Sequence, residues 1–213
     1  MEATRILAIR HGETAWNVDA RIQGQLDIAL NEKGRWQAAR LALALAARDR
    51  IDAIYTSDLV RARDTARAIA ERTGAPLTAD KGLRERAFGR YQGMTFAEIE
   101  AVRPDEAARW RHRDPHWAPP EGESLLQMRE RVRQTLDQLA ARHPGGQIAV
   151  VAHGGVLDLL YRAATGMELQ APRTWQLGNA AVNRLLWTTQ ALTLVGWADT
   201  AHLDEDWHDE TST

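Results

Sequence analysis

The sequence predicts an α/β protein of three layers, α/β/α, with helices on both faces of a mostly parallel central sheet. Short apolar runs alternate with stretches of helical periodicity along most of the 213 residues, which is typical of βαβ units. The run Ile148–Ala152 is apolar throughout, as strands buried on both faces are. A chain of this length buries roughly 70% of its unfolded surface in one core. We expect one domain over residues 1–200 and an acidic C-terminal tail over 201–213.

The pattern in the first half of the chain predicts three strands and two long helices. Strands are expected at Thr4–Ile9, Ile51–Tyr55 and Leu77–Thr78, and helices at Asn31–Ala47 and Leu59–Arg72. Each strand is a short apolar run, and each helix has apolar residues spaced three and four apart. The break Gly74-Ala75-Pro76 ends the second helix because glycine and proline interrupt helical backbone.

The second half of the chain gives two more long helices and a closing hairpin. Helices are expected at Leu125–Arg142 and Val156–Thr165, and strands at Ile148–Ala152, Leu185–Thr188 and Leu192–Trp197. Ser124-Leu125-Leu126-Gln127 has the form of a capping box, which begins the first of these helices. His143-Pro144-Gly145-Gly146 ends it. The last two strands are joined through Thr189-Gln190-Ala191, a connection short enough for a hairpin.

The segment Arg90–Glu123 interrupts this alternation. It is rich in arginine, histidine, tryptophan and proline, and it contains two short helical patterns at Phe96–Val102 and Asp105–Arg111. An excursion of this kind is where we expect substrate selectivity to lie. Within it, Trp110–Trp117 has three interpretations of equal weight: it grips a second anionic group or stacks on an aromatic ring, it forms a solvated lid, or it forms half of a dimer contact.

Composition excludes several classes of protein. The chain has no cysteine, so disulfides, thiolate metal sites and thiol nucleophiles are absent. A net charge of −2 argues against a general nucleic-acid binder, and no stretch approaches the ~20 apolar residues that span a membrane. The N-terminus has no basic, apolar leader, so we expect a cytoplasmic protein.

The charge is unevenly distributed. Six acidic residues and no lysine or arginine lie between Asp199 and the C-terminus, which leaves the rest of the chain mildly basic. We interpret His202–His208, which contains metal-ligand residue types, as part of a flexible acidic end. The alternative is that this tail folds over a basic pocket and competes with an anionic substrate.

Reactive residue types gather where predicted strands end. Arg10 and His11 follow the first strand, Arg61 lies in the first turn of the helix after the second, and His153 follows Ile148–Ala152. Glu85 lies among arginines in Leu83–Gly93. The carboxyl ends of strands in such sheets form the usual ligand-binding edge. Two arginines, two histidines and one carboxylate are the parts that phosphoryl transfer needs, and nearby guanidinium groups favour the neutral, nucleophilic form of a histidine.

The order of these motifs resembles that of the histidine phosphatase superfamily, in the branch that holds the cofactor-dependent phosphoglycerate mutases and related phosphatases. The resemblance implies a phosphoglycerate mutase-like fold and covers residues 5 to 200. It implies that His11 attacks phosphorus, that Arg10 and Arg61 hold the phosphoryl group, that His153 stabilises the transition state and that Glu85 protonates the leaving oxygen. Read individually, each has a structural alternative: His11 as a structural histidine, His153 as a helix cap and Glu85 as a member of a surface ion-pair cluster.

The resemblance also extends to substrate-binding positions. Asn17 matches an asparagine that orients the site, and Gln23 with Gly24 matches a loop that contacts phosphate through side chain and backbone. Gly154, directly after His153, lets the backbone approach a ligand. One departure is Ala29, where proline is common, and it concerns loop rigidity rather than chemistry.

The favoured function is hydrolysis of a small phosphorylated metabolite through a phosphohistidine. The alternative is a phosphoglycerate mutase, which the resemblance associates with a longer insertion than the modest one between Glu85 and His153. A catalytically silent phospho-ligand-binding protein is a third possibility, weakened because all five reactive residues are present. We expect no metal ion and no cofactor, because arginines and histidines neutralise the phosphoryl charge. A homodimer is possible.

Overall fold

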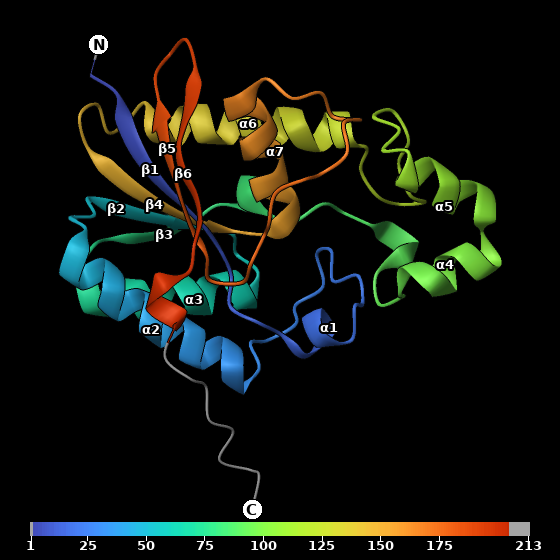
Figure 1. The fold of residues 1–213 in the computed structure, drawn as a ribbon, viewed down its shortest axis with the longest axis horizontal. Helices are drawn as coiled ribbons and strands as arrows, with labels where there is room; N and C mark the ends of the chain where they lie inside the picture. The colour runs from blue at the N-terminus through green and yellow to red at the C-terminus, as the bar shows by residue number, and fades with distance from the viewer. Residues whose placement is uncertain (1, 205–213) are drawn as a thin grey trace, which may run out of the picture.

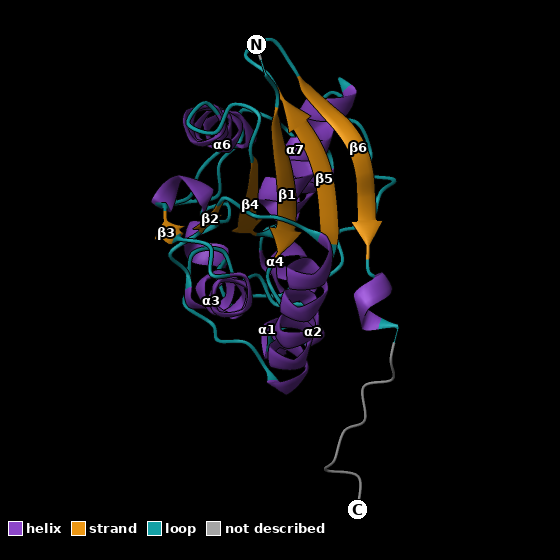
Figure 2. Cartoon of the chain, turned by 90° about the vertical axis from the view of Figure 1, so that its left-hand side faces the viewer, coloured by secondary structure: helices purple, strands orange, loops and turns teal. Residues whose placement is uncertain are grey.

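Six strands form the central sheet of the computed structural model, which describes residues 2–204. The strands are β1 (Thr4–Arg10), β2 (Ala53–Thr56), β3 (Leu77–Ala79), β4 (Gln147–Ala152), β5 (Val182–Trp187) and β6 (Leu192–Asp199). Their order across the sheet is β3-β2-β4-β1-β5-β6. The first four in this order run parallel, and β5 and β6 run antiparallel at one edge (Figure 2). The prediction of a mostly parallel sheet is confirmed.

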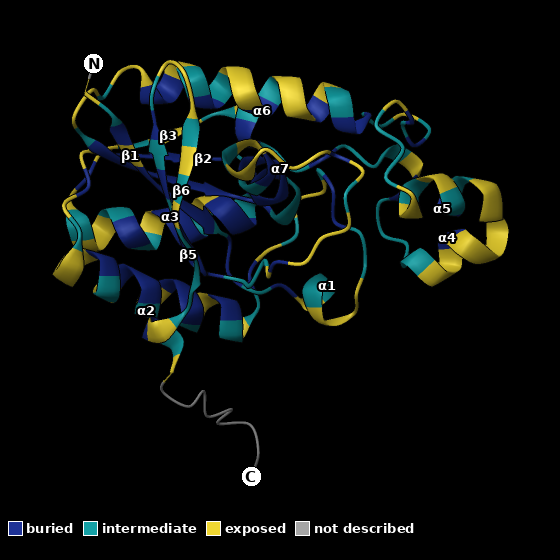
Figure 3. Cartoon of the chain, turned by 45° about the horizontal axis from the view of Figure 1, so that its top comes forward, coloured by how far each residue is buried: buried dark blue, intermediate teal, exposed yellow. Residues whose placement is uncertain are grey.

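Four long helices cover the two faces of this sheet. Helices α2 (Glu32–Arg48) and α3 (Val60–Thr73) lie on one face, and α6 (Leu125–Ala140) and α7 (Gly154–Thr165) lie on the other (Figure 1). Successive side chains of β1 point to opposite faces of the sheet. Ile6 packs in the core with α6 and α7, and Leu7 packs in the core with α2 and α3. The inner strands β1, β2, β4 and β5 are mostly buried, whereas the edge strands β3 and β6 are partly exposed (Figure 3). The three-layer prediction is therefore confirmed.

A small lobe stands at one side of the molecule. It consists of α4 (Phe96–Val102) and α5 (Pro104–Arg111) and the loops around them (Figure 1). Its buried centre contains Tyr91, Ile99, Ala107 and Trp117, with Trp110 stacked on Phe88 at a ring-centroid distance of 4.9 Å. Of the predicted segment Trp110–Trp117, both tryptophans thus belong to this packed lobe. A solvated lid does not describe these two tryptophans, because their rings pack with centroids 6.2 Å apart. Binding of a second anionic group or an aromatic ring, and a dimer contact, stay predictions.

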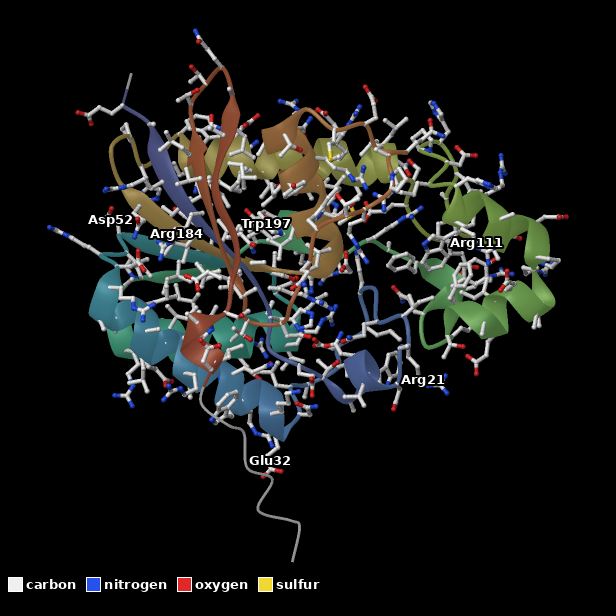
Figure 4. All side chains as sticks on the ribbon, viewed as in Figure 1. Arg21, Glu32, Asp52, Arg111, Arg184 and Trp197 are labelled. Carbon is white, nitrogen blue, oxygen red and sulfur yellow. The ribbon has the colours of Figure 1, made fainter. Side chains whose placement is uncertain are left out.

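Two side chains at the lobe show how it is held. Arg21, in the loop after α1 (Ala15–Val18), donates to the Gly93 carbonyl at 2.7 Å and pairs with Glu98 of α4. Arg111, on α5, lies over the Phe96 ring at 5.2 Å from its centroid. Figure 4 labels both arginines, one beside α1 and the other on the lobe. Helix α4 is therefore contacted by Arg21 from the loop after α1 and by Arg111 from α5.

Several element ends differ from the sequence expectations. Helix α6 ends at Ala140 rather than Arg142, and its last residues turn with Arg142 N donating to Leu139 O and His143 N to Ala140 O. The Thr4 hydroxyl, 2.9 Å from the Ala140 and His143 carbonyls, donates at this helix end. Helix α1 was not expected; it is one turn closed by a capping box between Thr14 and Asn17. Strands β5 and β6 are longer than the predicted hairpin because they pair with each other and β5 also pairs with β1.

The packed part of the chain extends past residue 200. Residues Ala201–Leu203 form the short 3-10 helix η3, in which His202 is buried and its backbone carbonyl accepts a hydrogen bond from Arg40 at 3.2 Å. The tail expected to begin at 201 is thus packed against α2 at its start, while residues 205–213 and any contact between them and the pocket lie outside the described residues. Within residues 2–204 no helix is long and apolar enough to cross a bilayer.

Candidate active site

Two histidines meet at the carboxyl edge of the sheet. Strands β1 and β4 are neighbours, with Arg10 opposite Ala152, so His11 and His153 leave the sheet side by side. The His11 amide donates to the Ala152 carbonyl at 3.0 Å, and the two ring centroids are 5.3 Å apart. This separation leaves both imidazoles within reach of one tetrahedral phosphoryl group.

The tautomer of His11 follows from its contacts. Its Nδ1 lies 2.7 Å from the Gly12 carbonyl, which can only accept, so Nδ1 carries the proton and Nε2 carries the lone pair. Arg61 Nε donates to that Nε2 at 3.3 Å. Burial, together with the positive charges of Arg10 and Arg61, lowers the pKa of His11 well below its usual value of 6.5. The ring is therefore neutral and presents a nucleophilic nitrogen.

His153 is fully buried and has unused hydrogen-bonding capacity. Neither ring nitrogen has a partner among the described residues. Burial lowers its pKa well below 6.5, and the nearby charge of Arg61 adds to the effect. A buried polar ring without partners costs free energy, which a ligand that accepts its N–H would recover. His153 occupies the N-cap position of α7, but its side chain makes no capping hydrogen bond, so helix capping does not account for the buried ring.

Two guanidinium groups flank the histidines. Arg61, in the first turn of α3, is 1% exposed and donates to the carbonyls of Gly24 at 2.7 Å and Leu26 at 2.8 Å. Burial lowers its pKa to about 10, so it remains a cation at neutral pH. Arg10 donates to the Leu177 carbonyl, and its buried Nε has no partner in the described part of the chain. Positive charge and an unused donor therefore converge beside His11.

The residues expected to bind substrate lie around the same point, with different local roles. Gly24 adopts a φ of +53°, which favours glycine, and its carbonyl fixes Arg61. Gln23 is buried, and its Oε1 has no partner within residues 2–204. Asn17 uses its side-chain oxygen to cap α1 at Thr14. Gly154 begins α7, and a Cβ there would lie 3.6 Å from Arg10 Nε. Gln23, Gly24 and Gly154 thus stand next to an arginine or on the loop that holds Arg61. Asn17 is connected to the site through Asn179, which donates to Asn17 Oδ1 and to the His11 carbonyl.

Glu85 is held by backbone amides rather than by an ion pair. Its Oε2 accepts from the Gly155 amide at 3.0 Å, and its Oε1 from the Arg86 amide at 2.8 Å. Glu85 is half-buried and forms no ion pair with any residue from 2 to 204, so the surface ion-pair interpretation is wrong. A Cβ on Gly155 would come within 2.2 Å of Oε1, so the carboxylate lies directly on the first turn of α7.

Two residues that the sequence analysis missed support the site. Asn179 donates to the His11 carbonyl at 2.9 Å, across 168 residues of sequence, and nothing in its local pattern indicates this. Arg131 of α6 donates to the carbonyls of Gly82 and Arg84 and pairs with Glu123, so it holds the backbone that presents Glu85. Its position beside the buried residues Met128 and Val132 is a signal that could have found it.

The assembled groups suit attack on a phosphate ester. A neutral imidazole nitrogen, two cations, a second imidazole with one unpartnered N–H and a carboxylate surround one point at the sheet edge. Among the described residues, no group of three or more His, Asp or Glu side chains could hold a metal ion. Positive charge at this point comes from Arg10 and Arg61.

Comparisons with known proteins agree with this arrangement. A family model, the histidine phosphatase superfamily (branch 1), matches residues 6–200. Two relatives from Arabidopsis thaliana are "Phosphoglycerate mutase-like protein 4", 37% identical over 96% of this chain and 89% of its own length, and "Metal-independent phosphoserine phosphatase", 38% identical over 95% and 84%. The native structure of a mycobacterial glucosyl-3-phosphoglycerate phosphatase superposes with a TM-score of 0.83 at 35% identity, covering 93% of this chain and all of that one. The chain belongs to branch 1 of the histidine phosphatase superfamily.

Proposed function

We propose that this protein is a phosphomonoester hydrolase that acts on a small phosphorylated metabolite through a phosphohistidine. The observation that carries the proposal is the unprotonated Nε2 of His11, held between Arg61 and the ring of His153. Two of the compared proteins are named as phosphatases. The modest size of the α4–α5 lobe also favours hydrolysis over retention of the phosphoryl group.

In the first half-reaction His11 Nε2 forms a bond to phosphorus while the bond from phosphorus to the ester oxygen breaks. Arg10, Arg61 and His153 donate to the phosphoryl oxygens and stabilise their charge. Glu85, as the general acid, gives a proton to the leaving oxygen as the ester bond breaks. The alcohol leaves, and the phosphoryl group stays on His11.

In the second half-reaction water takes the place of the alcohol. Glu85, now a carboxylate, accepts a proton from the water. The water oxygen bonds to phosphorus as the bond from phosphorus to His11 Nε2 breaks. Inorganic phosphate leaves and neutral His11 is restored. Glu85 regains from the water the proton that it gave to the alcohol, and each cycle consumes one water molecule.

The test of hydrolysis is a panel of phosphomonoesters that includes p-nitrophenyl phosphate and 3-phosphoglycerate. We expect inorganic phosphate from the panel and no 2-phosphoglycerate from 3-phosphoglycerate. Formation of 2-phosphoglycerate at a rate equal to or above that of phosphate release would favour the mutase alternative suggested by the name of one relative.

The test of the nucleophile is His11→Ala, which we expect to abolish both turnover and an acid-labile phosphoenzyme. The matched control is His112→Ala, at the exposed end of α5, which we expect to keep both. A His11→Ala variant that turns over at the wild-type rate contradicts the mechanism.

Metal chelation provides an independent check. Because guanidinium and imidazole groups supply the positive charge, we expect incubation with EDTA to leave kcat unchanged. Loss of activity that Mg²⁺ or Zn²⁺ restores would contradict the assignment of charge to Arg10 and Arg61. The cytoplasmic location and a homodimer stay predictions from the sequence.

A further inference from the structure

The connection between α7 and β5 reaches Arg10 at two points. Residues 166–181, all of them described, form this connection without a helix or a strand. Arg10 Nη1 donates to the Leu177 carbonyl, and the Ala180 amide donates to the Arg10 carbonyl at 3.0 Å. Because one end of the guanidinium is bound to Leu177, the position of that carbonyl determines where the other nitrogens of Arg10 point.

Aromatic side chains hold the residues directly before Leu177. Trp197 of β6, labelled in Figure 4, donates from its indole nitrogen to the Gln176 carbonyl at 2.8 Å. Trp175 is buried and stacks on Tyr161 of α7 at a ring-centroid distance of 4.1 Å. Tyr161 also meets the ring of Trp197 edge-on at 4.8 Å. The backbone that presents the Leu177 carbonyl is therefore held by side chains of α7 and β6.

Arg162, in the last turn of α7, holds the same connection at three positions. It is 2% exposed and donates to the carbonyls of Glu168 and, at 2.9 Å, Ala171. Its guanidinium carbon lies 4.8 Å from the centroid of the Trp175 ring. Its Nε donates to Asp158 at 3.0 Å, so all three nitrogens are bound and the buried charge has a counterion.

A second arginine binds the connection from the side of the α4–α5 lobe. Arg113 donates to the Leu169 carbonyl at 2.6 Å and to Asp158, also at 2.6 Å. An irregular segment keeps one conformation only where its contacts outweigh the entropy that it loses. Side chains from α7, β6 and the lobe supply those contacts here, and the segment they hold ends at Arg10 and His11.

We propose that Arg162 and Trp197 are positioning residues for Arg10. By holding the connection they fix the Leu177 carbonyl, and this carbonyl orients the guanidinium that binds the phosphoryl group. The inference deepens the proposed function and rests on it, since it assigns what places one of the two phosphate-binding cations. Arg61 does not depend on this connection, because its guanidinium is held by carbonyls of the loop at Gly24 and Leu26.

Trp197→Phe removes one indole donor and keeps an aromatic ring. We expect the Kd for orthovanadate, a tetrahedral oxyanion similar to phosphate, to rise by about threefold, measured by isothermal titration calorimetry. The matched control is Trp187→Phe, which loses an indole hydrogen bond of the same length, 2.8 Å, to Asp137. Both variants should lower the melting temperature by about 2–4 °C, but the control should keep the wild-type Kd. An unchanged Kd in Trp197→Phe would overturn the role of Trp197.

Arg162→Lys keeps the positive charge beside Asp158. An ammonium group cannot donate to Asp158, Glu168 and Ala171 from one rigid fork, so the connection loses contacts while the charge stays. We expect the Kd for orthovanadate to rise by about 10-fold, at a temperature where thermal unfolding shows the variant to be folded. A folded variant with the wild-type Kd would overturn the role of Arg162. Where this variant does not fold, Trp197→Phe decides the question.

A double-mutant cycle tests whether the effect passes through Arg10. In an Arg10→Ala background the guanidinium is already absent, so we expect Arg162→Lys to change the Kd for orthovanadate by less than about twofold. In an Arg61→Ala background the same substitution should keep its effect of about 10-fold. Equal effects in both backgrounds would show that Arg162 does not act through Arg10 and would overturn the proposal. Trp197→Phe replaces Arg162→Lys in the cycle where the latter does not fold.

The outcomes separate this inference from the proposed function. A wild type that hydrolyses p-nitrophenyl phosphate and binds orthovanadate, with an unchanged Kd in both variants, leaves the phosphatase proposal standing and removes the positioning role. A wild type that neither hydrolyses p-nitrophenyl phosphate nor binds orthovanadate removes the phosphatase proposal, and the positioning role with it.

Discussion

The proposed role of His11 depends on a single backbone contact. The Gly12 carbonyl holds the Nδ1 proton, and this places the lone pair on Nε2, beside Arg61 and the proposed phosphoryl site. Low pKa values for His11 and His153 keep both rings neutral at physiological pH. We therefore assign the acid limb of a pH–rate profile to protonation of the substrate phosphate, whose second pKa is about 6, and not to the nucleophile.

The glycines that begin α7 give a residue-scale prediction. A Cβ at Gly155 would lie 2.2 Å from Glu85 Oε1, the end of a flexible side chain that can move. We expect Gly155→Ala to keep or slightly raise stability, since alanine favours helix by about 0.5–1 kcal/mol, and to lower kcat by about 100-fold as the carboxyl is displaced.

The matched comparison for Gly155→Ala is Gly154→Ala, whose Cβ would make an ordinary contact 3.6 Å from Arg10 Nε. We expect a smaller loss of kcat there, measured on the same ester. Equal losses in the two variants would show that displacement of Glu85 is not the cause. Thermal unfolding of both variants checks that the fold is kept.

At the scale of elements, α6 positions the segment that carries Glu85. Arg131 donates to the Gly82 carbonyl at 2.8 Å and the Arg84 carbonyl at 2.9 Å, and its guanidinium also pairs with Glu123. A guanidinium reaches these acceptors from one rigid fork, whereas an ammonium is a point charge. Helix α6 thus supports the backbone of the segment that carries the proposed acid Glu85.

We expect Arg131→Lys to lower the free energy of unfolding by about 1–3 kcal/mol, because two carbonyls lose their donors. We also expect kcat to fall, as Glu85 becomes less firmly placed. Urea unfolding and steady-state kinetics measure the two effects. Arg129→Lys, exposed on the same helix, is the control and should change stability by less than about 0.5 kcal/mol. If Arg131→Lys is as stable and as active as Arg129→Lys, then Arg131 does not hold the segment that carries Glu85.

At the scale of the whole molecule, the burial of His11 and His153 makes the free energy of unfolding depend on pH. Both have folded-state pKa values well below 6.5, so between that value and their folded pKa values the unfolded chain binds more protons than the folded one. Stability is fully present above pH 6.5 and decreases as the pH falls below it. Each histidine contributes a slope of up to about 1.4 kcal/mol per pH unit.

We expect the free energy of unfolding to fall between pH 7 and about 5.5, and His153→Gln to flatten this slope by up to about 1.4 kcal/mol per unit. Urea titrations of both proteins at each pH provide the measurement. A variant with the wild-type slope would show that protonation of His153 is not linked to unfolding. The difference between the two proteins removes the contribution of carboxyl groups, which both share.

Local patterns in the sequence are enough to predict the layers of the fold and the edge at which the site lies. Alternating apolar runs and helical spacing indicated the three layers, and the position of reactive residues directly after strands indicated the edge at which they meet. Motifs in order along the chain indicated the family. These inferences succeed because hydrophobic periodicity and strand ends are properties of neighbouring residues.

The tertiary structure alone decided which distant groups touch. Asn179 donates to the His11 carbonyl, Arg113 donates to Asp158, and Thr4 donates to the Ala140 carbonyl at the end of α6. Each of these hydrogen bonds joins residues 45 or more positions apart in the sequence. These contacts follow from the packing of helices on the sheet, and no spacing within a segment records them. For the same reason a cavity of about 180 Å³ beside Glu85 could not be foreseen, because its walls come from five separate parts of the chain and only their packing encloses a volume.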